Sequence, residues 1–274
     1  GMLVGNLLAL HLNLPLTDVD GLCKKRLLQS GRRHKKPDFS EIDDVLIIDD
    51  SVCHGTQMEE TQSRIESKNL QCNIEYAAIY ITPKGHQYID YWADVIDIPR
   101  YFEWNIMHHD KLSEMCVDID GVLCRDPDSK ENDDGENYQK FVSTVEPRVV
   151  PTKKIGWLVT SRLEKYREET EEWLAKNGIE YEELIMMDHP DMWTRQLEGD
   201  HSDYKAKVYE SVDAELFIES SPSQSTEIAQ ETGKPVFCFE NNTMIYPDSL
   251  AASKQKIESG IKRSEEYLRR FSYN

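Results

Sequence analysis

The chain has 274 residues, a length that fits two domains of ordinary size. It carries 32 basic and 51 acidic residues, and the formal charge of −19 argues against nucleic-acid backbones and anionic membranes as general partners. Its apolar stretches are far shorter than a membrane span, and we find no secretory signal pattern. The six cysteines show no Cys-x-x-Cys pair and no zinc spacing with histidine. Cys116 and Cys238 fall in strand patterns, so we expect them to be core thiols in a reducing cytoplasm.

The first segment with a clear pattern is residues 1–10, an apolar run that predicts a helix. The segment 24–36 then carries seven Lys and Arg residues and no acid, which is typical of a solvated basic loop. Residues 45–48 form a four-residue apolar run that Asp49 and Asp50 close. Such a run is typical of a fully buried parallel strand.

A loop of small residues follows this strand and precedes a helical pattern. The backbone N–H groups of this loop, from Cys53 to Thr56, could cradle a phosphate. The carboxylates of Asp49 and Asp50 suit ribose hydroxyls, which would donate charge-assisted hydrogen bonds to them. The alternative is a strand–turn–helix unit that binds no ligand.

The segment 99–112 predicts a junction between two domains, because aromatic residues crowd its start. His108, His109 and Asp110 follow these aromatic residues and raise the question of a metal site. Adjacent side chains of a strand point to opposite sides, so a single ion would not reach both histidines. We therefore expect a structural role for this group.

Residues 115–123 read Met-Cys-Val-Asp-Ile-Asp-Gly-Val-Leu and carry the strongest functional signal. An apolar strand bears Asp118 and Asp120, whose side chains share one face, and breaks at Gly121. Acids at the carboxyl end of a buried strand lie where open α/β sheets bind ligands, and a cation or a proton would relieve their repulsion. A nucleophilic carboxylate, a Mg²⁺ ion and a second carboxyl group for proton transfer form a phosphoryl-transfer set. A solvated turn is the alternative.

Three later positions extend this pattern. Residues 155–162 predict a strand that ends in hydroxyl residues, among them Thr160, and Lys205 starts a helical stretch. Residues 214–221 predict a strand that ends in Glu219 and two serines. A hydroxyl beside free N–H groups suits a phosphate oxygen, and a lysine would neutralise the charge of that oxygen. Taken singly, each position also fits a helix cap, a surface lysine or a strand-end turn.

The order of these groups resembles the haloacid dehalogenase-like (HAD) phosphohydrolase superfamily across residues 112–245. The resemblance implies that Asp118 is a nucleophile that forms an aspartyl-phosphate and that Asp120 is a general acid/base. It also implies that Thr160 binds the phosphoryl group and that Lys205 stabilises its charge.

The resemblance further implies a Mg²⁺ site, in which Asp118 and Asp120 act with the acids of a fourth family motif. Glu219 and Ser220 stand in the place of that motif, so a hydroxyl replaces the usual second carboxylate. Carboxylates, phosphates and water usually hold Mg²⁺, so the lost carboxylate predicts weaker metal binding and less turnover. The acidic segment 126–136 predicts an exposed flap near this site.

The strand and loop at residues 45–56 resemble the phosphoribosyl-diphosphate (PRPP) loop of type I phosphoribosyltransferases. The resemblance implies Asp49 and Asp50 as ribose-binding acids. It implies a 5′-phosphate cradle made by Cys53, His54, Gly55 and Thr56. His54 stands where Thr or Ser is usual, which replaces a small hydroxyl donor with an imidazole. In that family a strand and a pyrophosphate-binding loop precede the first helix, so the resemblance implies an incomplete N-terminal unit.

We therefore expect an α/β protein with two Rossmann-like three-layer domains and mainly parallel sheets, at residues 1–105 and 112–274. The favoured function is the Mg²⁺-dependent hydrolysis of a small phosphomonoester, such as a sugar phosphate or a nucleotide. Phosphoribosyl transfer from PRPP and catalytically weak binding of a phosphorylated metabolite are the alternatives. The apolar stripe within residues 250–271 predicts a helix that packs on a domain or subunit surface, which would allow a homo-oligomer.

Overall fold

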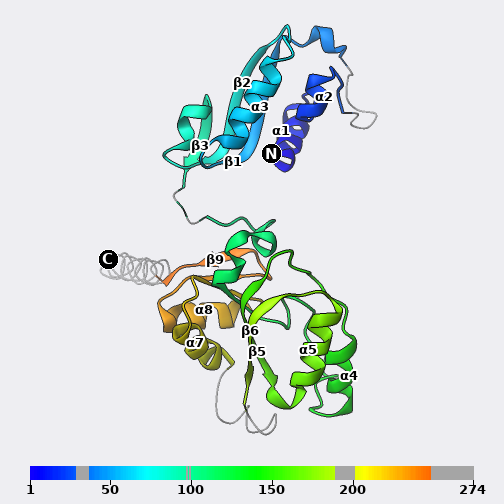
Figure 1. Ribbon diagram of the computed structural model, residues 1–274, viewed down its shortest axis with the longest axis vertical. Helices are drawn as coiled ribbons and strands as arrows, with labels where there is room; N and C mark the ends of the chain where they lie inside the picture. Colours follow the sequence, from blue (N-terminus) through cyan, green and yellow to red (C-terminus); the bar gives the residue numbers. More distant parts are fainter. Residues whose placement is uncertain (29–36, 97, 99, 189–200, 248–274) are drawn as a thin grey trace, which may run out of the picture. The chain divides into compact units, whose positions relative to one another are not determined.

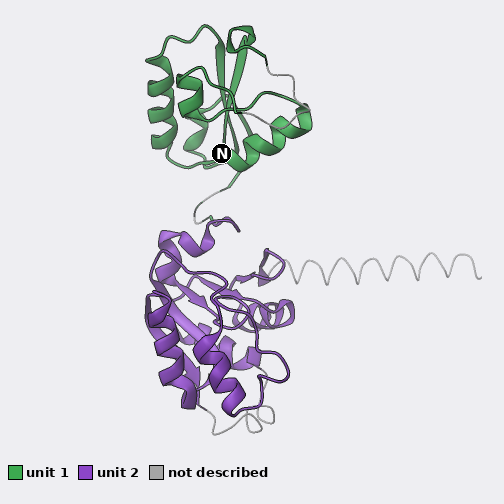
Figure 2. Cartoon of the chain, turned by 90° about the vertical axis from the view of Figure 1, so that its right-hand side faces the viewer, with its two compact units in different colours: residues 1–100 green, residues 101–274 purple. Residues whose placement is uncertain are grey.

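A computed structural model gives the fold of the chain. It describes residues 1–28, 37–96, 98, 100–188 and 201–247. The chain forms two compact units, residues 1–100 and residues 101–274, each with its own sheet (Figures 1 and 2). No helix in the described ranges is both long and apolar enough to cross a bilayer. The expected C-terminal helix at residues 250–271 lies outside the described residues.

The first unit is built on a parallel sheet of three strands. The strands lie in the order β1 (Asp44–Val52), β2 (Asn73–Ile81) and β3 (Tyr91–Val95). The helices of this unit are α1 (Met2–Leu12), α2 (Val19–Cys23), α3 (Thr56–Glu66) and the 3₁₀ helices η1 (Phe39–Glu41) and η2 (Gly85–Tyr88). Its small core consists of Val52, Met58, Ala78, Ile81 and Ile89.

Strand β1 differs in two ways from the strand that the sequence predicts. Its pairing with β2 continues past Asp49 to Val52, so Asp49 and Asp50 lie inside the strand instead of closing it. The apolar run is also less buried than expected, because Leu46 is 51% exposed and its apolar neighbours are half-buried. The sheet order explains this exposure, since within the described part of the unit β1 has a strand partner on one side only.

The second unit contains a sheet of six strands in the order β6-β5-β4-β7-β8-β9. Neighbouring strands are parallel except β8 and β9. The strands are β4 (Met115–Val117), β5 (Ile155–Leu163), β6 (Tyr181–Met187), β7 (Leu216–Glu219), β8 (Val236–Cys238) and β9 (Thr243–Ile245). The helices are α4 (Glu136–Thr144), α5 (Arg167–Lys176), α7 (His201–Ser211) and α8 (Pro222–Thr232). The prediction of α/β architecture with mainly parallel sheets is confirmed.

Helices cover both faces of this second sheet, α4 and α5 on one face and α7 and α8 on the other (Figure 1). The central strand β4 shows how the sequence produces this arrangement. Met115 and Val117 pack into the larger core cluster, whereas Cys116 packs into the cluster of α7 and α8. All three side chains are fully buried because successive strand residues point to opposite faces and both faces are covered.

The segment that begins at Tyr101 belongs to the second unit, which therefore starts earlier than the predicted residue 112. Ile106 and Met107 lie in the 3₁₀ helix η3 (Ile106–His108) and are buried in the core of this unit. Because these two apolar side chains pack on the second unit, the first unit ends at residue 100 instead of residue 105.

The histidine pair after this segment has structural contacts. A ring nitrogen of His109 accepts a hydrogen bond of 3.1 Å from the backbone N–H of Lys111, at the start of the 3₁₀ helix η4 (Asp110–Glu114). The ring of His108 hydrogen-bonds to Thr152. The second unit also contains the 3₁₀ helix η5 (Glu164–Tyr166), which precedes α5.

Candidate active site

The candidate site lies at the carboxyl ends of three neighbouring strands. β4 lies between β5 and β7, and Val117 of β4 pairs with both Leu158 and Ile218. Asp118 follows Val117 directly, and its backbone N–H donates a hydrogen bond to the carbonyl of Ile218. Because Glu219 is the last residue of β7, the register places the two acids side by side.

Lys205 of α7 lies between these two acids. Its Nζ is 2.7 Å from Oδ2 of Asp118 and 2.6 Å from Oε2 of Glu219, and it also donates to Oε1 of Gln224 at 3.2 Å. Lys205 is 2% exposed, and Asp118 and Glu219 are also buried, at 4% and 0%. The alternative of a surface lysine is therefore wrong. The structure brings together three of the predicted site residues, Asp118, Lys205 and Glu219.

The charges of this cluster do not cancel, because two carboxylates share one ammonium group. The pKa of Asp118 is raised well above its ordinary value, mainly by burial, with the charges of Glu219 and Asp120 adding to the effect. Burial lowers the pKa of Lys205, but the two carboxylates outweigh it and the net change is an increase. A cation near the carboxylates would offset the remaining negative charge.

The second oxygen of each acid is held by the backbone. Oδ1 of Asp118 accepts a hydrogen bond of 2.8 Å from the N–H of Ile119. Oε1 of Glu219 accepts one of 2.9 Å from the N–H of Ser221. Each carboxylate is therefore held by the backbone through one oxygen and contacts Lys205 through the other. Groups held in place in this way are preorganised to stabilise charge during a reaction.

Asp120 has a different partner, which the sequence analysis missed. Arg162 of β5 is 1% exposed, and its Nη2 lies 2.7 Å from Oδ1 of Asp120, with Nε 3.1 Å from Oδ2. The thiol of Cys124 donates to Oδ1 of Asp120 at 3.3 Å. A shift in the pairing of β5 with β6 between Thr160 and Leu163 accompanies the inward position of Arg162. An arginine inside an otherwise buried strand was the available signal for this pair.

Thr160 lies inside β5, which continues to Leu163 instead of ending at the hydroxyl residues. Its side chain is fully buried, and its Oγ1 accepts a hydrogen bond of 3.2 Å from the N–H of Arg162. The role of a helix cap does not fit a residue in the interior of a strand. The pairing of β4 with β5 places Thr160 beside the segment that begins at Asp118.

Ser220 packs beneath the turn that follows Asp120. Gly121 has a φ of +82°, and a Cβ atom at this glycine would overlap with the side chain of Ser220 and lie 3.2 Å from Oδ2 of Asp126. Oγ of Ser220 donates a hydrogen bond of 3.3 Å to the carbonyl of Asp120. The close approach of the turn gives a steric reason for a small residue at position 220.

The atoms of the site that could coordinate a metal ion are all oxygens, and oxygen ligands suit a hard cation such as Mg²⁺. They come from Asp118, Glu219, the carbonyl of Asp120 and the hydroxyl of Ser220. The described part of the chain contains no group of three His, Cys, Asp or Glu side chains placed to hold a metal. The carboxylate of Asp120 is turned towards Arg162, so the expected ligand set is reduced to two carboxylates and neutral oxygens.

An exposed arginine, Arg148, lies beside the turn that follows Asp120. Nη1 of Arg148 donates a hydrogen bond of 2.9 Å to the carbonyl of Gly121, and its guanidinium stacks over the ring of Phe239 at 5.1 Å. Arg125 nearby is engaged in a two-point ion pair with Glu131. Both arginines line a cavity of about 340 Å³.

The acids of the first unit lie beside the amino group of Gly1. This group is 2.8 Å from Oδ1 of Asp49 and 2.7 Å from Oδ1 of Asp50. Burial, together with the neighbouring Asp50, raises the pKa of Asp49.

The loop that follows is packed beneath an aromatic ring. Gly55 has a φ of +83°, and a Cβ atom there would overlap with the ring of Tyr88. The carbonyl of Cys53 accepts a hydrogen bond of 2.6 Å from the hydroxyl of Thr82. Thr56 starts α3 without a side-chain cap, and His54 is exposed. The ring of Tyr88 thus covers one side of the predicted phosphate cradle.

Comparison with known proteins leaves the family open. No family model and no curated protein matches the chain. Among solved structures, one chain of the Pnkp1/Rnl/Hen1 RNA repair complex is 14% identical with a TM-score of 0.35, covering 72% of this chain and 96% of that one. A chain from another structure of the Pnkp1/Rnl/Hen1 complex is 15% identical with a TM-score of 0.32 over the same shares. Similarity at this level carries no argument about function.

Proposed function

We propose that the second unit hydrolyses a small phosphomonoester through an aspartyl-phosphate on Asp118. One observation supports this proposal above the others: the ammonium group of Lys205 bridges Asp118 and Glu219 in a buried position at the carboxyl edge of the sheet. Burying three charged groups is costly, and such clusters with perturbed pKa values gather at functional sites. The HAD resemblance assigns catalytic roles to the same residues.

The reaction would proceed in two displacements at phosphorus. A carboxylate oxygen of Asp118 forms the new O–P bond while the P–O bond to the leaving group breaks, and the leaving oxygen takes up a proton. Water then attacks the phosphorus, which frees inorganic phosphate and restores the carboxylate. Lys205 would offset the charge on the phosphoryl oxygens, Thr160 would bind one of them, and Asp120 would serve the proton transfers.

Mg²⁺ is the metal that the proposal requires. Asp118, Glu219 and the carbonyl of Asp120 would hold the ion, with Ser220 as a weak neutral donor. When bound, the ion neutralises negative charge on the phosphoryl group. Two carboxylates instead of three predict an affinity lower than that of a site with a full acidic set.

Two observations favour a second candidate, a weakly catalytic protein that binds a phosphorylated metabolite. The carboxylate of Asp120 is held by the buried guanidinium of Arg162, and Ser220 supplies no charge to a metal. Both features reduce what the site can contribute to turnover, whereas neither alters Lys205, whose ammonium group is bonded to Asp118, Glu219 and Gln224. In either case, the partner we propose is a small phosphorylated metabolite in a reducing cytoplasm, where the free thiols of the chain are stable.

Phosphate release by the full chain tests the proposal. The assay uses p-nitrophenyl phosphate and a panel of sugar phosphates and nucleotides, with Mg²⁺ or with a chelator. We expect Mg²⁺-dependent release that falls by several orders of magnitude in Asp118→Asn, as for other lost nucleophiles. Glu172→Gln, an exposed substitution on α5, is the matched control and should be unaffected. Tight binding of a metabolite without release would favour the second candidate.

A further inference from the structure

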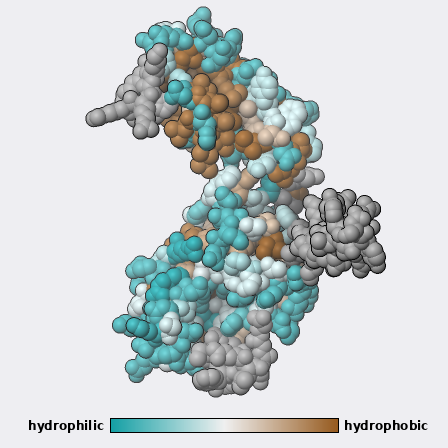
Figure 3. Space-filling model, turned by 180° about the vertical axis from the view of Figure 1, so that it is seen from behind, coloured by the Kyte–Doolittle hydropathy of each residue, from teal (hydrophilic) through white to brown (hydrophobic). Residues whose placement is uncertain are grey.

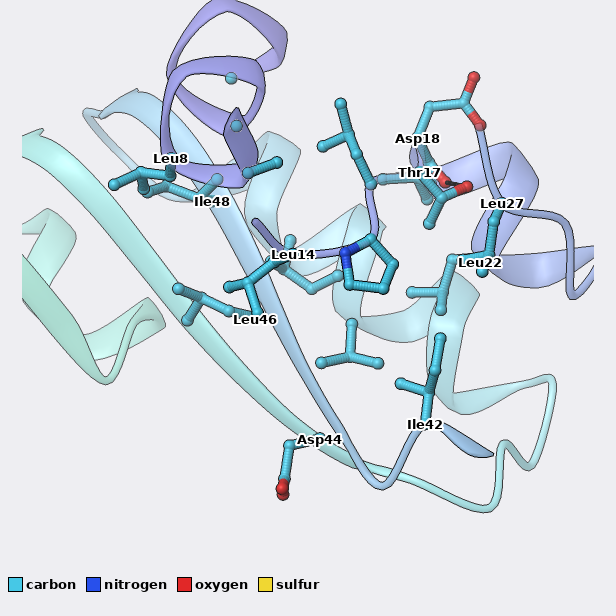
Figure 4. A pocket seen from close by; sticks show the side chains of 18 of the residues that line it. Leu8, Leu14, Thr17, Asp18, Leu22, Leu27, Ile42, Asp44, Leu46 and Ile48 are labelled. Carbon is cyan, nitrogen blue, oxygen red and sulfur yellow. Dashed lines mark hydrogen bonds between the residues drawn. The ribbon is translucent and has the colours of Figure 1, made fainter. Parts of the chain in front are cut away.

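The buried charges of the molecule are concentrated in its second unit. The first unit contains an apolar groove of about 720 Å³ (Figure 4), and apolar side chains gather on the surface of the same unit (Figure 3). None of the described residues that line this groove is a buried charged side chain. In the described part of the chain, such side chains all lie in the second unit: Asp118, Arg162, Lys205 and Glu219. The proposed reaction uses three of them and gives Arg162 no function.

The side chain of Arg162 lies behind the carboxylate with which it pairs. The Arg162 side chain is 0% exposed, whereas that of Asp120 is 18% exposed. A guanidinium group that binds a phosphoryl group must reach that group directly. Because Asp120 is the accessible member of this pair, the substrate can contact the acid and not the arginine. Any effect of Arg162 on the reaction therefore passes through Asp120.

The guanidinium group fixes both oxygens of Asp120. Nη2 donates to Oδ1 at 2.7 Å and Nε donates to Oδ2 at 3.1 Å, which is the two-point geometry of an arginine fork. Oδ1 also accepts hydrogen bonds from Nε of Arg162 and from the thiol of Cys124, each at 3.3 Å. In the described residues, Oδ2 accepts from Nε alone. A carboxylate has about four acceptor positions, so Oδ2 is the oxygen that keeps room for a proton.

Arg162 is itself held by helix α5. Its Nη1 lies 3.5 Å from Oγ1 of Thr170, and its guanidinium lies 5.8 Å from the centre of the Trp173 ring. Both helix residues are buried, and the indole N–H of Trp173 donates a hydrogen bond of 2.6 Å to the carbonyl of Val145. The packing of α5 on the sheet therefore sets the direction in which the carboxylate of Asp120 points.

Stability alone does not explain this ion pair. Removing two charges from water costs about as much free energy as their attraction returns, so apolar side chains of the same volume often serve stability equally well. The pair lies two residues after Asp118, where a functional explanation is available. Proton transfer requires a carboxyl group that is within hydrogen-bond reach of the reacting oxygen and correctly oriented.

We propose that Arg162 is a positioning residue for the phosphoryl transfer and acts by orienting the carboxyl group of Asp120. The proposal rests on the function proposed for the second unit. In the first displacement, the proton on Oδ2 of Asp120 passes to the leaving oxygen as its P–O bond breaks. In the second, the same oxygen accepts a proton from the water that attacks the aspartyl-phosphate, which restores the starting state. Arg162 transfers no proton.

This role is opposite to the one that the weakly catalytic candidate gives the same ion pair. In that candidate the guanidinium restrains Asp120 and reduces turnover, so that replacing Arg162 would not slow the reaction. The positioning role also predicts a difference between substrates. Nitrophenolate is a stable anion that leaves without a proton, whereas the alkoxide of an alkyl phosphate needs one.

The test compares kcat/KM of the full chain for p-nitrophenyl phosphate and for the best alkyl phosphate among glycerol 2-phosphate, glucose 6-phosphate and AMP. This parameter covers the steps up to the departure of the leaving group. We expect Arg162→Met to lower kcat/KM about a hundredfold or more for the alkyl phosphate, the contribution of a general acid, and less than about tenfold for p-nitrophenyl phosphate. Asp120→Asn should give the same pattern. The double variant should be no worse than Asp120→Asn, because the two residues act as one unit.

Two further variants separate this effect from a folding defect, which thermal unfolding of each variant would reveal. Arg162→Lys keeps a positive charge beside Asp120 but loses the two-point contact, so it should fold and still show the difference between the substrates. Arg167→Gln is the matched control, because Arg167 also pairs with two acids, Glu164 and Glu171, outside the candidate site. It should leave both kcat/KM values unchanged.

Several results would overturn the proposal. Equal losses for both substrates in Arg162→Met and Arg162→Lys would indicate a purely structural role. Unchanged or faster hydrolysis of the alkyl phosphate would mean that the pair restrains Asp120. Losses that multiply in the double variant, or a native chain that hydrolyses p-nitrophenyl phosphate alone, would show that Asp120 is not oriented as a general acid. The absence of Mg²⁺-dependent release from any substrate would instead refute the proposed function, and the positioning role with it.

Discussion

The guanidinium of Arg162 forms a two-point ion pair with the carboxylate of Asp120, with Nη2 2.7 Å from Oδ1 and Nε 3.1 Å from Oδ2. This pair separates the functions of two acids that lie two residues apart. Asp118 takes Lys205 as its counterion, whereas Asp120 takes a buried arginine. The two carboxylates therefore do not share one proton or one cation symmetrically. A substitution of Lys205 tests the role of Asp118, and a substitution of Arg162 tests the role of Asp120.

Lys205 should matter more for stability than the acid it contacts. Lys205→Met leaves Asp118 and Glu219 buried together without a cation, which should destabilise the second unit by about 3–5 kcal/mol. Asp118→Asn keeps the pair of Lys205 with Glu219, so its stability should lie within about 1 kcal/mol of the native chain. Thermal unfolding of both variants tests this asymmetry. Equal losses would mean that Lys205 does not hold two acids at once.

The defect of Lys205→Met should depend on pH. The pKa of Asp118 is raised above its ordinary value of 3.8, so the folded state binds this proton more tightly than the unfolded state. Protonation therefore stabilises the folded chain below the ordinary carboxyl pKa, and this contribution is lost as pH rises through the raised pKa. The difference in Tm between native chain and variant should shrink as pH falls towards 4. A difference independent of pH would contradict the burial of two ionised acids.

Gly121 should tolerate no side chain. A Cβ atom at Gly121 would overlap with Ser220, whereas Gly178, which also has a positive φ of 68°, has open space around it. Gly178→Ala should cost about 1 kcal/mol from backbone strain alone. Gly121→Ala should cost about 1–3 kcal/mol more, because the turn must move away from Ser220. Urea denaturation measures both variants, and equal losses would show that the turn does not press on Ser220.

The six thiols should fall into two classes. Cys116, Cys124 and Cys238 are buried, and burial raises the pKa of Cys116 to about 12. Because the thiolate is the reactive form, these thiols should react with a disulfide reagent only after unfolding. The partly exposed thiols should react in the native chain, namely Cys23, Cys53 and Cys72. Fast modification of Cys116 in native conditions would contradict the packing of the central strand.

Arg148 should act in substrate binding. Its guanidinium is held by the carbonyl of Gly121 and the ring of Phe239 beside the turn that follows Asp120, while that of Arg125 is engaged by Glu131. For a phosphomonoester with a second anionic group, Arg148→Ala should raise KM about tenfold, the effect of one charged hydrogen bond. Arg125→Ala is the control and should change KM little. A similar change for substrates without a second anion would argue against direct recognition.

The sequence predicted much of the candidate site because strand ends are local signals. Asp118 and Glu219 each end an apolar run, and parallel packing brings such ends to one edge of the sheet. The order of acid pair, hydroxyl, lysine and acid along the sequence assigned Lys205 to the site. Its burial could not be predicted, because it depends on how α7 packs across β7. Arg162 was missed, because one arginine in an apolar run says nothing about which acid it meets across forty residues of chain.

The exposure of β1 shows a different limit. The apolar run that contains Leu46 correctly predicts a strand that prefers to be covered on both faces. A sequence pattern cannot state which segment supplies the cover, since that depends on tertiary neighbours. The same reasoning applies to α1, whose leucines predict burial that the described residues of the first unit do not provide.

Intact-protein and peptide mass spectrometry of acid-quenched reactions tests the central claim most directly. With a phosphomonoester and Mg²⁺, we predict that one phosphoryl group is attached to the peptide containing Asp118. The adduct should be released by hydroxylamine, which cleaves acyl phosphates, and should be absent in Asp118→Asn. Phosphate release at native rates by Asp118→Asn, or a phosphoryl group on any other residue, would contradict the account.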